Sequence, residues 1–398
     1  MPRLLSKSWL DSYLEYQENT ENPKDYNLWA GLSVLSSALK RQVFMHYRGF
    51  KLYPNQYIIL VGPAGIGKGS AINPAADIAE EAGVVNYIKD KITPEELINQ
   101  LNSGFAKTVP TSPGANTFSI STDHNATVLA LEFPVFLASH ESMHSILCAF
   151  WDQGKFVYGT KNKGRYAIDN LGVSLIGGCV PDFVRSLSRD RMAPITGGFT
   201  ARTIWVYAME RDKLIPDQFD APSQITSDLK FKLINDIKHI SSLNGVFTID
   251  AKAKALWISK YAEHNSKQTG FDSDATSTFR SRISTHILKS ALAISVSESD
   301  SLIITENQLA RAITIIEGVR DKVDIVFRCI GESPVAVSQD KIRGYIEANG
   351  LVSRSVLLKH FYRDVTDEQL TIVLYTLKMA GIIEEDIQGN KLYYKSLI

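Results

Sequence analysis

The stretch 57-YIILVGPAGIGKGSAINPAADIAEEAG-83 decides the fold of this chain. A short apolar run is followed by a glycine-rich turn and a helical segment, so the stretch predicts a strand, a loop and a helix. Its middle part, Gly62-Pro63-Ala64-Gly65-Ile66-Gly67-Lys68, matches the phosphate-binding pattern G-x-x-x-x-G-K-[ST] up to the last position. Glycines let backbone N–H groups point at an anion, and the following helix adds its positive dipole end. We therefore expect a nucleotide site in which Lys68 neutralises phosphates.

The residue after Lys68 departs from this pattern. A Ser or Thr there usually holds Mg²⁺, and Gly69 has no side chain that can do so. We expect Ser70, one place later, to take over this role directly or through a water molecule. The form GPAGIGKGS is also close to the loop of adenylate-type nucleotide kinases. Against a kinase, about 56 residues precede the loop, and no arginine for a second nucleotide occurs between Arg48 and Arg165.

The amino-acid composition limits the kinds of protein that this chain can be. The chain has 398 residues, of which 44% are hydrophobic and 22% charged, so it can bury a core over more than one domain. Its formal net charge of +0 means that a DNA partner must be met by local basic patches. The three cysteines are far apart, which predicts neither a disulfide framework nor a zinc site. No apolar run is long enough to span a bilayer, so we expect a cytoplasmic protein with no membrane partner.

Strands alternate with helices around the glycine turn, which predicts an α/β fold with a mainly parallel sheet covered on both faces. We expect strands at 57–61, 133–141, 171–178 and 203–208, and a loop at 103–117. From about 225 to 330 the pattern is mostly helical, with helices at 251–266, 278–297 and 305–329.

The last part of the chain has a different pattern. Helices are expected at 338–349, 353–361 and 366–380, followed by a hairpin over 382–395 with Gly389-Asn390 in its turn. Helices followed by a two-stranded wing predict a winged-helix module. The expected organisation is an N-terminal helical segment (1–50), a P-loop ATPase core (51–215), a helical lid (216–330) and a winged-helix domain (331–398).

Two further residues are candidates for chemistry on the nucleotide. Glu141 ends the apolar run 133-FPVFLASHE-141, and a carboxylate at the end of a neighbouring strand can orient and activate the attacking water. Alternatively, Glu141 only caps the following helix. Arg202 ends the turn 196-TGGFTAR-202, a position that suits an arginine finger reaching the γ-phosphate of a neighbouring subunit. The alternative for Arg202 is a structural ion pair.

Basic residues occur in three more places. Arg282 begins an apolar helix and either reaches the ATP phosphates from the lid or lies in a solvated first turn. Lys161, Lys163 and Arg165 lie in a predicted hairpin with interleaved aromatic residues, a composition that can follow a phosphate backbone and stack on bases. A second basic group, in the predicted winged helix, is the next candidate for DNA contact, and the alternative there is a protein-interaction module. The residues of this second group that we expect to contact DNA are Arg354, Lys359 and Arg363.

Taken together, these residues resemble the AAA+-type P-loop ATPases of phage, prophage and plasmid replication modules. They are most similar to a primase/helicase-like family catalogued as a domain of unknown function. The similar segments are 14–44, 52–68, 174–184 and 197–208, within roughly the first two-thirds of the chain. The order of parts is also similar to that of minichromosome maintenance helicases.

The resemblance implies ATP and Mg²⁺ as cofactors and a homo-oligomeric, hexameric ring. It implies Lys68 on the phosphates, Glu141 on the water, Arg202 on the neighbour's nucleotide, and the 161–165 hairpin on DNA in a central pore. It also exposes departures, because Cys179 stands where such a family has a polar Asn or Thr. The implied function is an ATP-dependent, helicase-like DNA motor of a phage or mobile element in the bacterial cytoplasm. The alternative is an ATP-regulated DNA-binding initiator or loader with little turnover.

Overall fold

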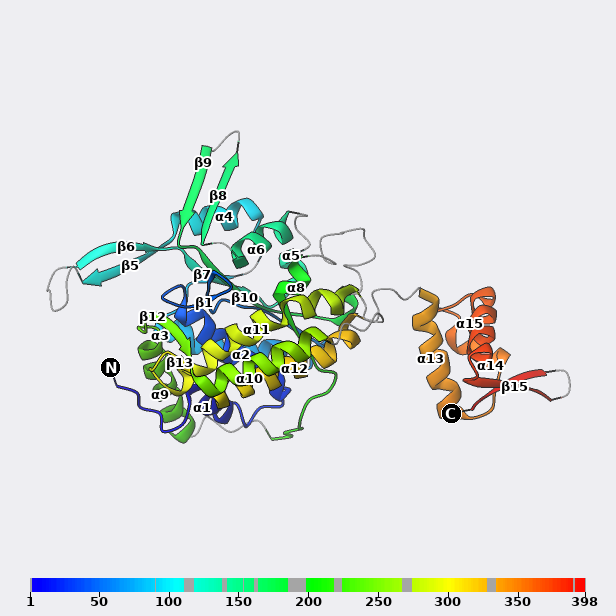
Figure 1. Ribbon diagram of the computed structural model, residues 1–398. Helices are drawn as coiled ribbons and strands as arrows, with labels where there is room; N and C mark the ends of the chain where they lie inside the picture. Colours follow the sequence, from blue (N-terminus) through cyan, green and yellow to red (C-terminus); the bar gives the residue numbers. More distant parts are fainter. Residues whose placement is uncertain are drawn as a thin grey trace. The chain divides into compact units, whose positions relative to one another are not determined.

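The computed structural model describes residues 2–89, 91–110, 118–137, 142–152, 154–160, 164–184, 198–217, 224–266, 274–327, 334–388 and 391–397. Contacts within the chain divide it into two compact units, residues 1–327 and 328–398 (Figure 1).

The larger unit is built on a five-stranded sheet in which every neighbouring pair is parallel. Every residue of its three central strands is buried, as expected for strands covered on both faces. The predicted parallel sheet is therefore confirmed. In spatial order the strands are β11 (Thr203–Tyr207), β3 (Tyr57–Val61), β10 (Gly172–Cys179), β7 (Asn125–Ala130) and β4 (Tyr87–Lys89).

Helices cover both faces of this sheet (Figure 1). The connection from β3 to β4 and the connection from β7 to β10 run in opposite directions across the sheet. Because such crossovers are right-handed, the helix of the first connection lies on one face and the helices of the second lie on the other. The first face carries α2 (Lys24–Leu39) and α3 (Lys68–Ala82), and the second carries α5 (Phe133–Leu137) and α6 (Met143–Asp152). The other helices of this part are α1 (Trp9–Tyr16), α4 (Pro94–Ser103), α8 (Thr200–Arg202) and α9 (Gln224–Ile240).

Two local predictions were wrong. Residues 133–137 form helix α5, and the neighbouring strand is β7, which lies earlier in the sequence. Pro134 favours a helix start, because the first helical turn does not need its missing N–H. Residues 105–110 were predicted as loop and instead form strand β5 (Phe105–Pro110), which pairs antiparallel with β6 (Phe118–Asp123).

A second hairpin was predicted correctly. Strands β8 (Lys155–Thr160) and β9 (Gly164–Asp169) pair antiparallel, and both this hairpin and the β5–β6 hairpin extend away from the central sheet (Figure 1). The predicted DNA-contacting residues Lys161 and Lys163 lie outside the described residues, and so does the side chain of Arg165.

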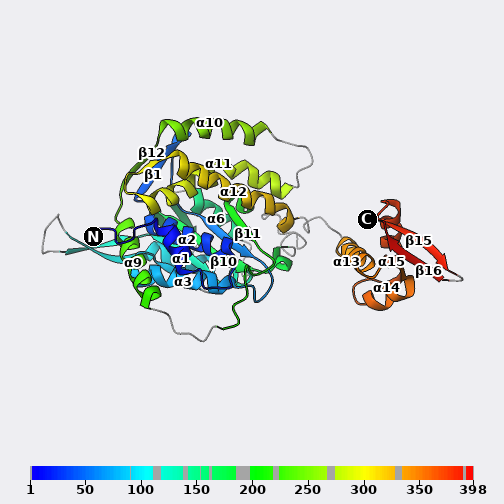
Figure 2. The same cartoon turned by 90° about the horizontal axis from the view of Figure 1, so that it is seen from below.

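A second sheet joins the N-terminal region to the helical region. Its order is β13-β12-β1-β2, in which β12 pairs parallel with β1 and β1 pairs antiparallel with β2. Neither β12 nor β13 was predicted, whereas the three long helices were. These helices lie together on one side of the unit (Figure 2). The elements are β1 (Val43–Tyr47), β2 (Phe50–Leu52), β12 (Gly245–Ile249), α10 (Ala251–Ser266), α11 (Asp274–Glu298), β13 (Ile303–Ile304) and α12 (Glu306–Phe327).

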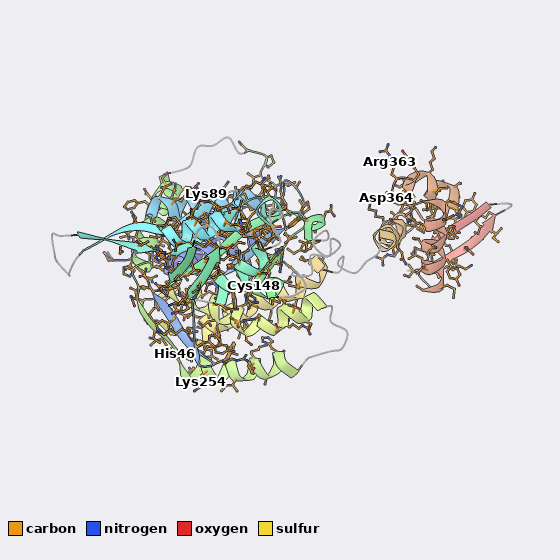
Figure 3. All side chains as sticks on the ribbon, turned by 90° about the horizontal axis from the view of Figure 1, so that it is seen from above. His46, Lys89, Cys148, Lys254, Arg363 and Asp364 are labelled. Carbon is orange, nitrogen blue, oxygen red and sulfur yellow. The ribbon has the colours of Figure 1, made fainter. Side chains whose placement is uncertain are left out.

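Over its described residues, the smaller unit has three helices and a three-stranded antiparallel sheet of order β14-β16-β15. The predicted helices and the predicted hairpin are confirmed over the described residues. Leu357, Leu370 and Leu374 belong to its buried core. Arg363 and Asp364 follow its second helix at the surface (Figure 3). The elements are α13 (Pro334–Asn349), β14 (Val352–Ser353), α14 (Arg354–Phe361), α15 (Asp367–Met379), β15 (Ile383–Gln388) and β16 (Lys391–Ser396).

A buried histidine connects the long helices to the core of the larger unit. His286 of α11 donates from Nε2 to the carbonyl oxygen of Ala201, at 2.8 Å, and its ring stacks on Phe279. Burial lowers the pKa of His286 to about 4, and the hydrogen bond to Ala201 opposes the shift. The folded chain therefore holds this imidazole neutral at a pH where the unfolded chain has begun to protonate it.

We predict a pH-dependent stability that His286→Asn removes. In the unfolded chain a histidine has a pKa near 6.5, so the contribution is fully present above that pH and is lost as the pH falls toward 4. The free energy of unfolding should fall by up to about 3 kcal/mol over this range. Urea unfolding between pH 4.5 and 7.5 measures it, with exposed His46→Asn as the control. An unchanged pH slope in the His286 variant would contradict the assignment.

Candidate functional site

The loop between β3 and α3 is the centre of the candidate site. Gly65 and Gly67 have φ angles of 78° and 104°, in the left-handed region that favours glycine. Gly67 is the N-cap of α3, and among the described residues no side chain caps this helix. The first N–H groups of α3 are therefore available to an anion, at the positive end of the helix dipole.

Close backbone packing fixes the start of this loop. The N–H of Gly62 donates to the carbonyl oxygen of Cys179, at 3.2 Å, at the end of β10. A Cβ atom on Gly62 would lie 2.4 Å from both the Ala208 carbonyl oxygen and the Tyr26 hydroxyl. Only glycine fits this position, so the loop is held among the carboxyl ends of β3, β10 and β11.

Lys68 lies over the loop. Its Nζ donates to the carbonyl oxygens of Gly62 and Pro63, each at 2.8 Å. The side chain is half-buried, and burial lowers the pKa of Lys68, while Cys179 and Glu132 oppose that shift. An ammonium group that rests on two neutral carbonyls can exchange them for phosphate oxygens with a gain in charge complementarity.

Glu132 is an acidic residue near Lys68 that the sequence analysis did not single out. It lies two residues after the end of β7 and is exposed, and its carbonyl oxygen accepts hydrogen bonds at the start of α5. The end of β10 brings it close to the loop, because a Cβ on Gly178 would lie 3.2 Å from the Leu131 carbonyl oxygen and 3.3 Å from Lys68. The predicted acidic residue, Glu141, lies outside the described residues. Glu132 is therefore the carboxylate that the described structure brings to Lys68.

Two other side chains hold the loop. The Ser70 hydroxyl has two acceptors within reach of its one proton, Asn22 Oδ1 at 2.7 Å and the Gly67 carbonyl oxygen at 3.0 Å, and the shorter contact ties α3 to the segment between α1 and α2. Arg211, which follows β11, donates to the Gly65 carbonyl oxygen at 2.9 Å and pairs with Glu21. Arg211 was also missed, and its signal was a cation shortly after a buried strand.

The described residues contain no group of three or more His, Cys, Asp or Glu side chains that could hold a metal ion. A divalent ion here would depend on ligands brought by a bound molecule, with Ser70 as the nearest hydroxyl to Lys68 in the sequence. Gly69 has open space around it, because no atom lies within 4 Å of a Cβ built there.

Strand order places this loop at a particular edge of the sheet. After β3 the chain crosses toward β4, and after β10 it crosses in the opposite direction to β11. The carboxyl ends of β3 and β10 therefore form a topological switch point, the place where open parallel sheets bind ligands. The glycine loop, Lys68 and Gly178 all lie there.

A largely apolar cavity of about 200 Å³ lies between α2, β11 and α12. Tyr207 in its wall immediately precedes Ala208, whose carbonyl oxygen contacts Gly62. Asp25 and Lys322 also line the cavity and form an ion pair of 2.6 Å. A cavity of this volume can hold a planar ring, on the side of the sheet edge where β11 ends. Its apolar walls come mainly from Leu28, Trp29, Val206, Ile315 and Val319.

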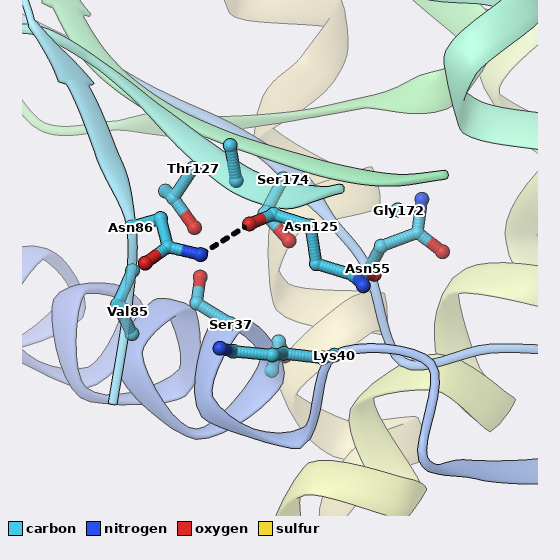
Figure 4. A pocket seen from close by; sticks show the side chains of 11 residues that line it. Ser37, Lys40, Asn55, Val85, Asn86, Asn125, Thr127, Gly172 and Ser174 are labelled. Atoms are coloured by element: carbon cyan, nitrogen blue, oxygen red, sulfur yellow. Dashed lines mark hydrogen bonds between the residues drawn. The ribbon is translucent and has the colours of Figure 1, made fainter. Parts of the chain in front are cut away.

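A second, polar cavity lies at the opposite edge of the sheet. It is lined by the first residues of β7 and β10 and by Ser37 and Lys40 of the α2 end, and Asn86 Nδ2 donates there to the Asn125 carbonyl oxygen (Figure 4). Its volume of about 10 Å³ holds no more than a water-sized molecule. This cavity is therefore not the candidate site.

Arg202 and Arg282 come together away from Lys68. Arg202 Nε donates to Asp152 Oδ2 at 3.0 Å, and Arg282 Nη1 lies 3.5 Å from Asp152 Oδ1. Both guanidinium groups lie over the Trp151 ring, at 5.7 and 5.4 Å from its centroid. Arg202 directly precedes Thr203, which pairs with Tyr57 at the amino end of β3. The structure thus places the predicted Arg282 with Arg202 at the edge opposite the glycine loop, and not at the loop of its own chain.

The three basic residues predicted in the smaller unit differ in their surroundings. Arg354 pairs with Asp367 at 2.7 Å and donates to Thr371, so it holds α14 to α15. Lys359 and Arg363 are exposed, and neither has a carboxylate partner among the described residues. Arg363 instead donates from Nε to the Tyr362 hydroxyl.

Within the described ranges, no helix has the length and apolar character needed to cross a membrane. A comparison of the sequence with protein-family models and with curated proteins finds no match to either.

Proposed function

We propose that the chain is an ATPase with an AAA+-type P-loop core, and that it works on DNA as a hexameric ring, like a replicative helicase. The observation that carries the proposal is the meeting of Lys68, Glu132 and the uncapped start of α3 at the switch point of a parallel sheet. This combination supplies a cation, a carboxylate and backbone donors where a triphosphate needs them.

In this proposal, each residue of the site has a separate role in ATP hydrolysis. The first N–H groups of α3 and Lys68 bind the β- and γ-phosphates, and the apolar cavity beside Tyr207 takes the base. Glu132 orients a water for attack on the γ-phosphorus and accepts its proton as the bond to ADP breaks. Ser70 is the hydroxyl of this loop that would help to hold Mg²⁺ together with the phosphates, and the ion would supply charge neutralisation there.

Arg202 serves a neighbouring subunit in this proposal. Within one chain it lies at the amino end of β11, a full strand length from the glycine loop, so it cannot contact its own nucleotide. In a ring the same edge faces the next subunit's phosphates, where an arginine stabilises the transition state. The ion pair with Asp152 and a hydrogen bond to the Gly198 carbonyl oxygen fix the orientation of the guanidinium, whose side chain is 13% exposed.

DNA contact is assigned to the β8–β9 hairpin and to the smaller unit, which we infer to be a winged-helix module. The order helix, strand, helix, helix, two-stranded wing supports this inference. Several cations of this unit are bound to carboxylates within it, including Lys341 to Asp364 and Lys378 to Glu385. Lys359 and Arg363 are the residues of the predicted set that we assign to DNA.

A second candidate function is an ATP-regulated DNA-binding initiator or loader. Cys179, at the end of β10, favours it, because burial raises the pKa of this thiol to about 12 and leaves no strong hydrogen-bonding group there. The motor requires ATP hydrolysis that single-stranded DNA stimulates. The initiator requires ATP-dependent DNA binding with little turnover. Hydrolysis rates measured with and without DNA, together with the mass of the assembly, separate the two.

Lys68→Ala should abolish ATP binding, because it removes the cation that lies over the glycine loop. Equilibrium binding of a fluorescent ATP analogue measures this effect. Lys89→Ala is the matched control, because Lys89 pairs with Glu80 at the surface and should leave affinity unchanged. Equal affinity in the Lys68 variant and the unmodified chain would refute the nucleotide site.

Glu132→Gln should retain ATP binding and lower the hydrolysis rate by roughly 10²-fold or more, because the amide cannot accept the proton of water. Glu141→Gln, which changes the carboxylate that the sequence favoured, is the comparison. Single-turnover hydrolysis and ATP affinity are measured for both. If only Glu141→Gln lowers the hydrolysis rate, the general base is Glu141 and not Glu132.

Arg202→Ala should bind ATP almost normally and lose roughly 10³-fold in hydrolysis. Mixing it with Lys68→Ala subunits should restore activity, since some interfaces then combine an intact lysine with an intact arginine. Asp152→Asn keeps the arginine and removes only its ion-pair partner, so it should hydrolyse ATP far better than Arg202→Ala. Equal losses in both variants, without complementation, would show that the ion pair is structural.

A further inference from the structure

The β1–β2 hairpin and the adjoining part of α10 form a surface of cations and aromatic rings that no assigned role uses. Within 43-VFMHYRGFKL-52, His46, Arg48 and Lys51 are exposed, and Phe50 is 50% exposed. On α10, Lys252 and Lys254 are exposed as well. We call this surface the hairpin platform.

The hairpin platform is positively charged in a chain whose net charge is zero. No Asp or Glu occurs between Asp25 and Asp77, the stretch that contains the whole hairpin. In the part of the chain that the structure describes, none of the exposed lysines and arginines of the platform has a carboxylate within ion-pair distance. Many other cations of the larger unit do, for example Lys230 with Glu81. The platform therefore has charge available for an anionic partner.

Aromatic rings fix the positions of these cations. The Arg48 guanidinium lies over the rings of Tyr47 and Tyr261, at 5.2 and 5.4 Å, and it bonds to the Tyr261 hydroxyl. Lys51 Nζ lies 4.3 Å from the Phe44 ring centroid. Cations held in place on rings lose less freedom when they bind a phosphate.

The hairpin is also fixed to α10. Tyr47 meets Trp257 of α10 edge to face, at 6.1 Å, and Figure 2 shows α10 beside β1 and β12. His46 and Lys254 lie at the same corner of the larger unit (Figure 3). Both elements therefore contribute to one surface.

The turn of the hairpin displays Arg48. Arg48 and Gly49 both have positive φ angles, 51° and 82°, as in the two-residue type I′ turn. Asn or Asp is the usual residue at the first position, and arginine is strained there. The strained turn places the Arg48 side chain at the tip of the hairpin. Phe50 is the first residue after the turn, and its ring meets the Tyr47 ring edge to face, with centroids 6.0 Å apart.

We propose that the hairpin platform binds single-stranded nucleic acid, with phosphates on Arg48, Lys51 and Lys254 and a base stacked on Phe50. Exposed rings interleaved with fixed cations are the chemistry that binds single strands without sequence preference. Binding to an anionic lipid surface scales with the apolar area inserted, and the half-exposed Phe50 ring offers little such area but enough for one stacked base, so we favour nucleic acid. The choice of DNA as the nucleic acid rests on the proposed function.

The test is nucleotide-free binding of a fluorescent oligothymidylate by the full chain, measured by anisotropy over a range of KCl concentrations. Arg48→Gln combined with Lys51→Gln should lower the salt slope of the binding constant by about 1.4, for two phosphate contacts. Phe50→Ala should weaken binding roughly tenfold and leave the salt slope unchanged. Lys232→Gln combined with Lys238→Gln, on exposed positions of α9, is the charge-matched control and should change neither quantity.

Unchanged affinity and slope in both platform variants would overturn the proposal. So would a loss of binding to phosphatidylserine vesicles, in the same variants, without a loss of DNA binding. Basal ATP hydrolysis of the unmodified chain is measured in parallel. If the chain does not hydrolyse ATP but the platform variants lose DNA binding as expected, the proposed function is wrong and this inference holds. If the chain hydrolyses ATP but the platform variants bind DNA normally, this inference is wrong and the proposed function holds.

Discussion

The contact on which the candidate site depends is the approach of Gly62 to the Ala208 carbonyl and the Tyr26 hydroxyl. This contact holds the turn after β3 against the ends of the neighbouring strands. The N–H of Gly62 adds a hydrogen bond to the carbonyl oxygen of Cys179. With the turn fixed there, α3 must start at the carboxyl edge of the sheet. Lys68 and the first N–H groups of α3 consequently face the switch point, and the end of β7 delivers Glu132 to the same place.

The strand, glycine loop and helix of 57–83 could be predicted from sequence because their signals are local. Left-handed turns need glycine, and buried strands need apolar runs. The carboxylate near Lys68, Glu132, could not be located in this way. Two short apolar runs, 125–130 and 133–137, stand almost side by side, and periodicity alone does not distinguish a buried strand from a buried helix over so few residues. Pro134 was the available signal, since it favours a helix start at the second run and leaves the first as the strand.

The positions of the arginines could not be predicted for a different reason. Arg202 and Arg282 are 80 residues apart in the sequence, yet both meet Asp152, which belongs to a third segment. Which edge of a sheet a side chain occupies depends on strand direction and order, and these follow from long-range pairing. The same limit applies to β12 and β13, whose pairing partners lie far away or outside their own helical region. The short run of β12 becomes a strand only when β1 lies beside it, and that of β13 only when β12 does.

The parallel pairing of β12 with β1 has a mechanical consequence. Backbone hydrogen bonds join Val43–Met45 to Gly245–Phe247, so the hairpin is fastened to the element that leads directly into α10. On its other side, a connection of four residues, 53–56, joins the hairpin to β3 and the glycine loop. Any displacement of α10 relative to the central sheet must therefore pull on the hairpin, because a hydrogen-bonded ladder transmits tension without stretching. The N-terminal hairpin is therefore the covalent and hydrogen-bonded link between α10 and the glycine loop inside the larger unit.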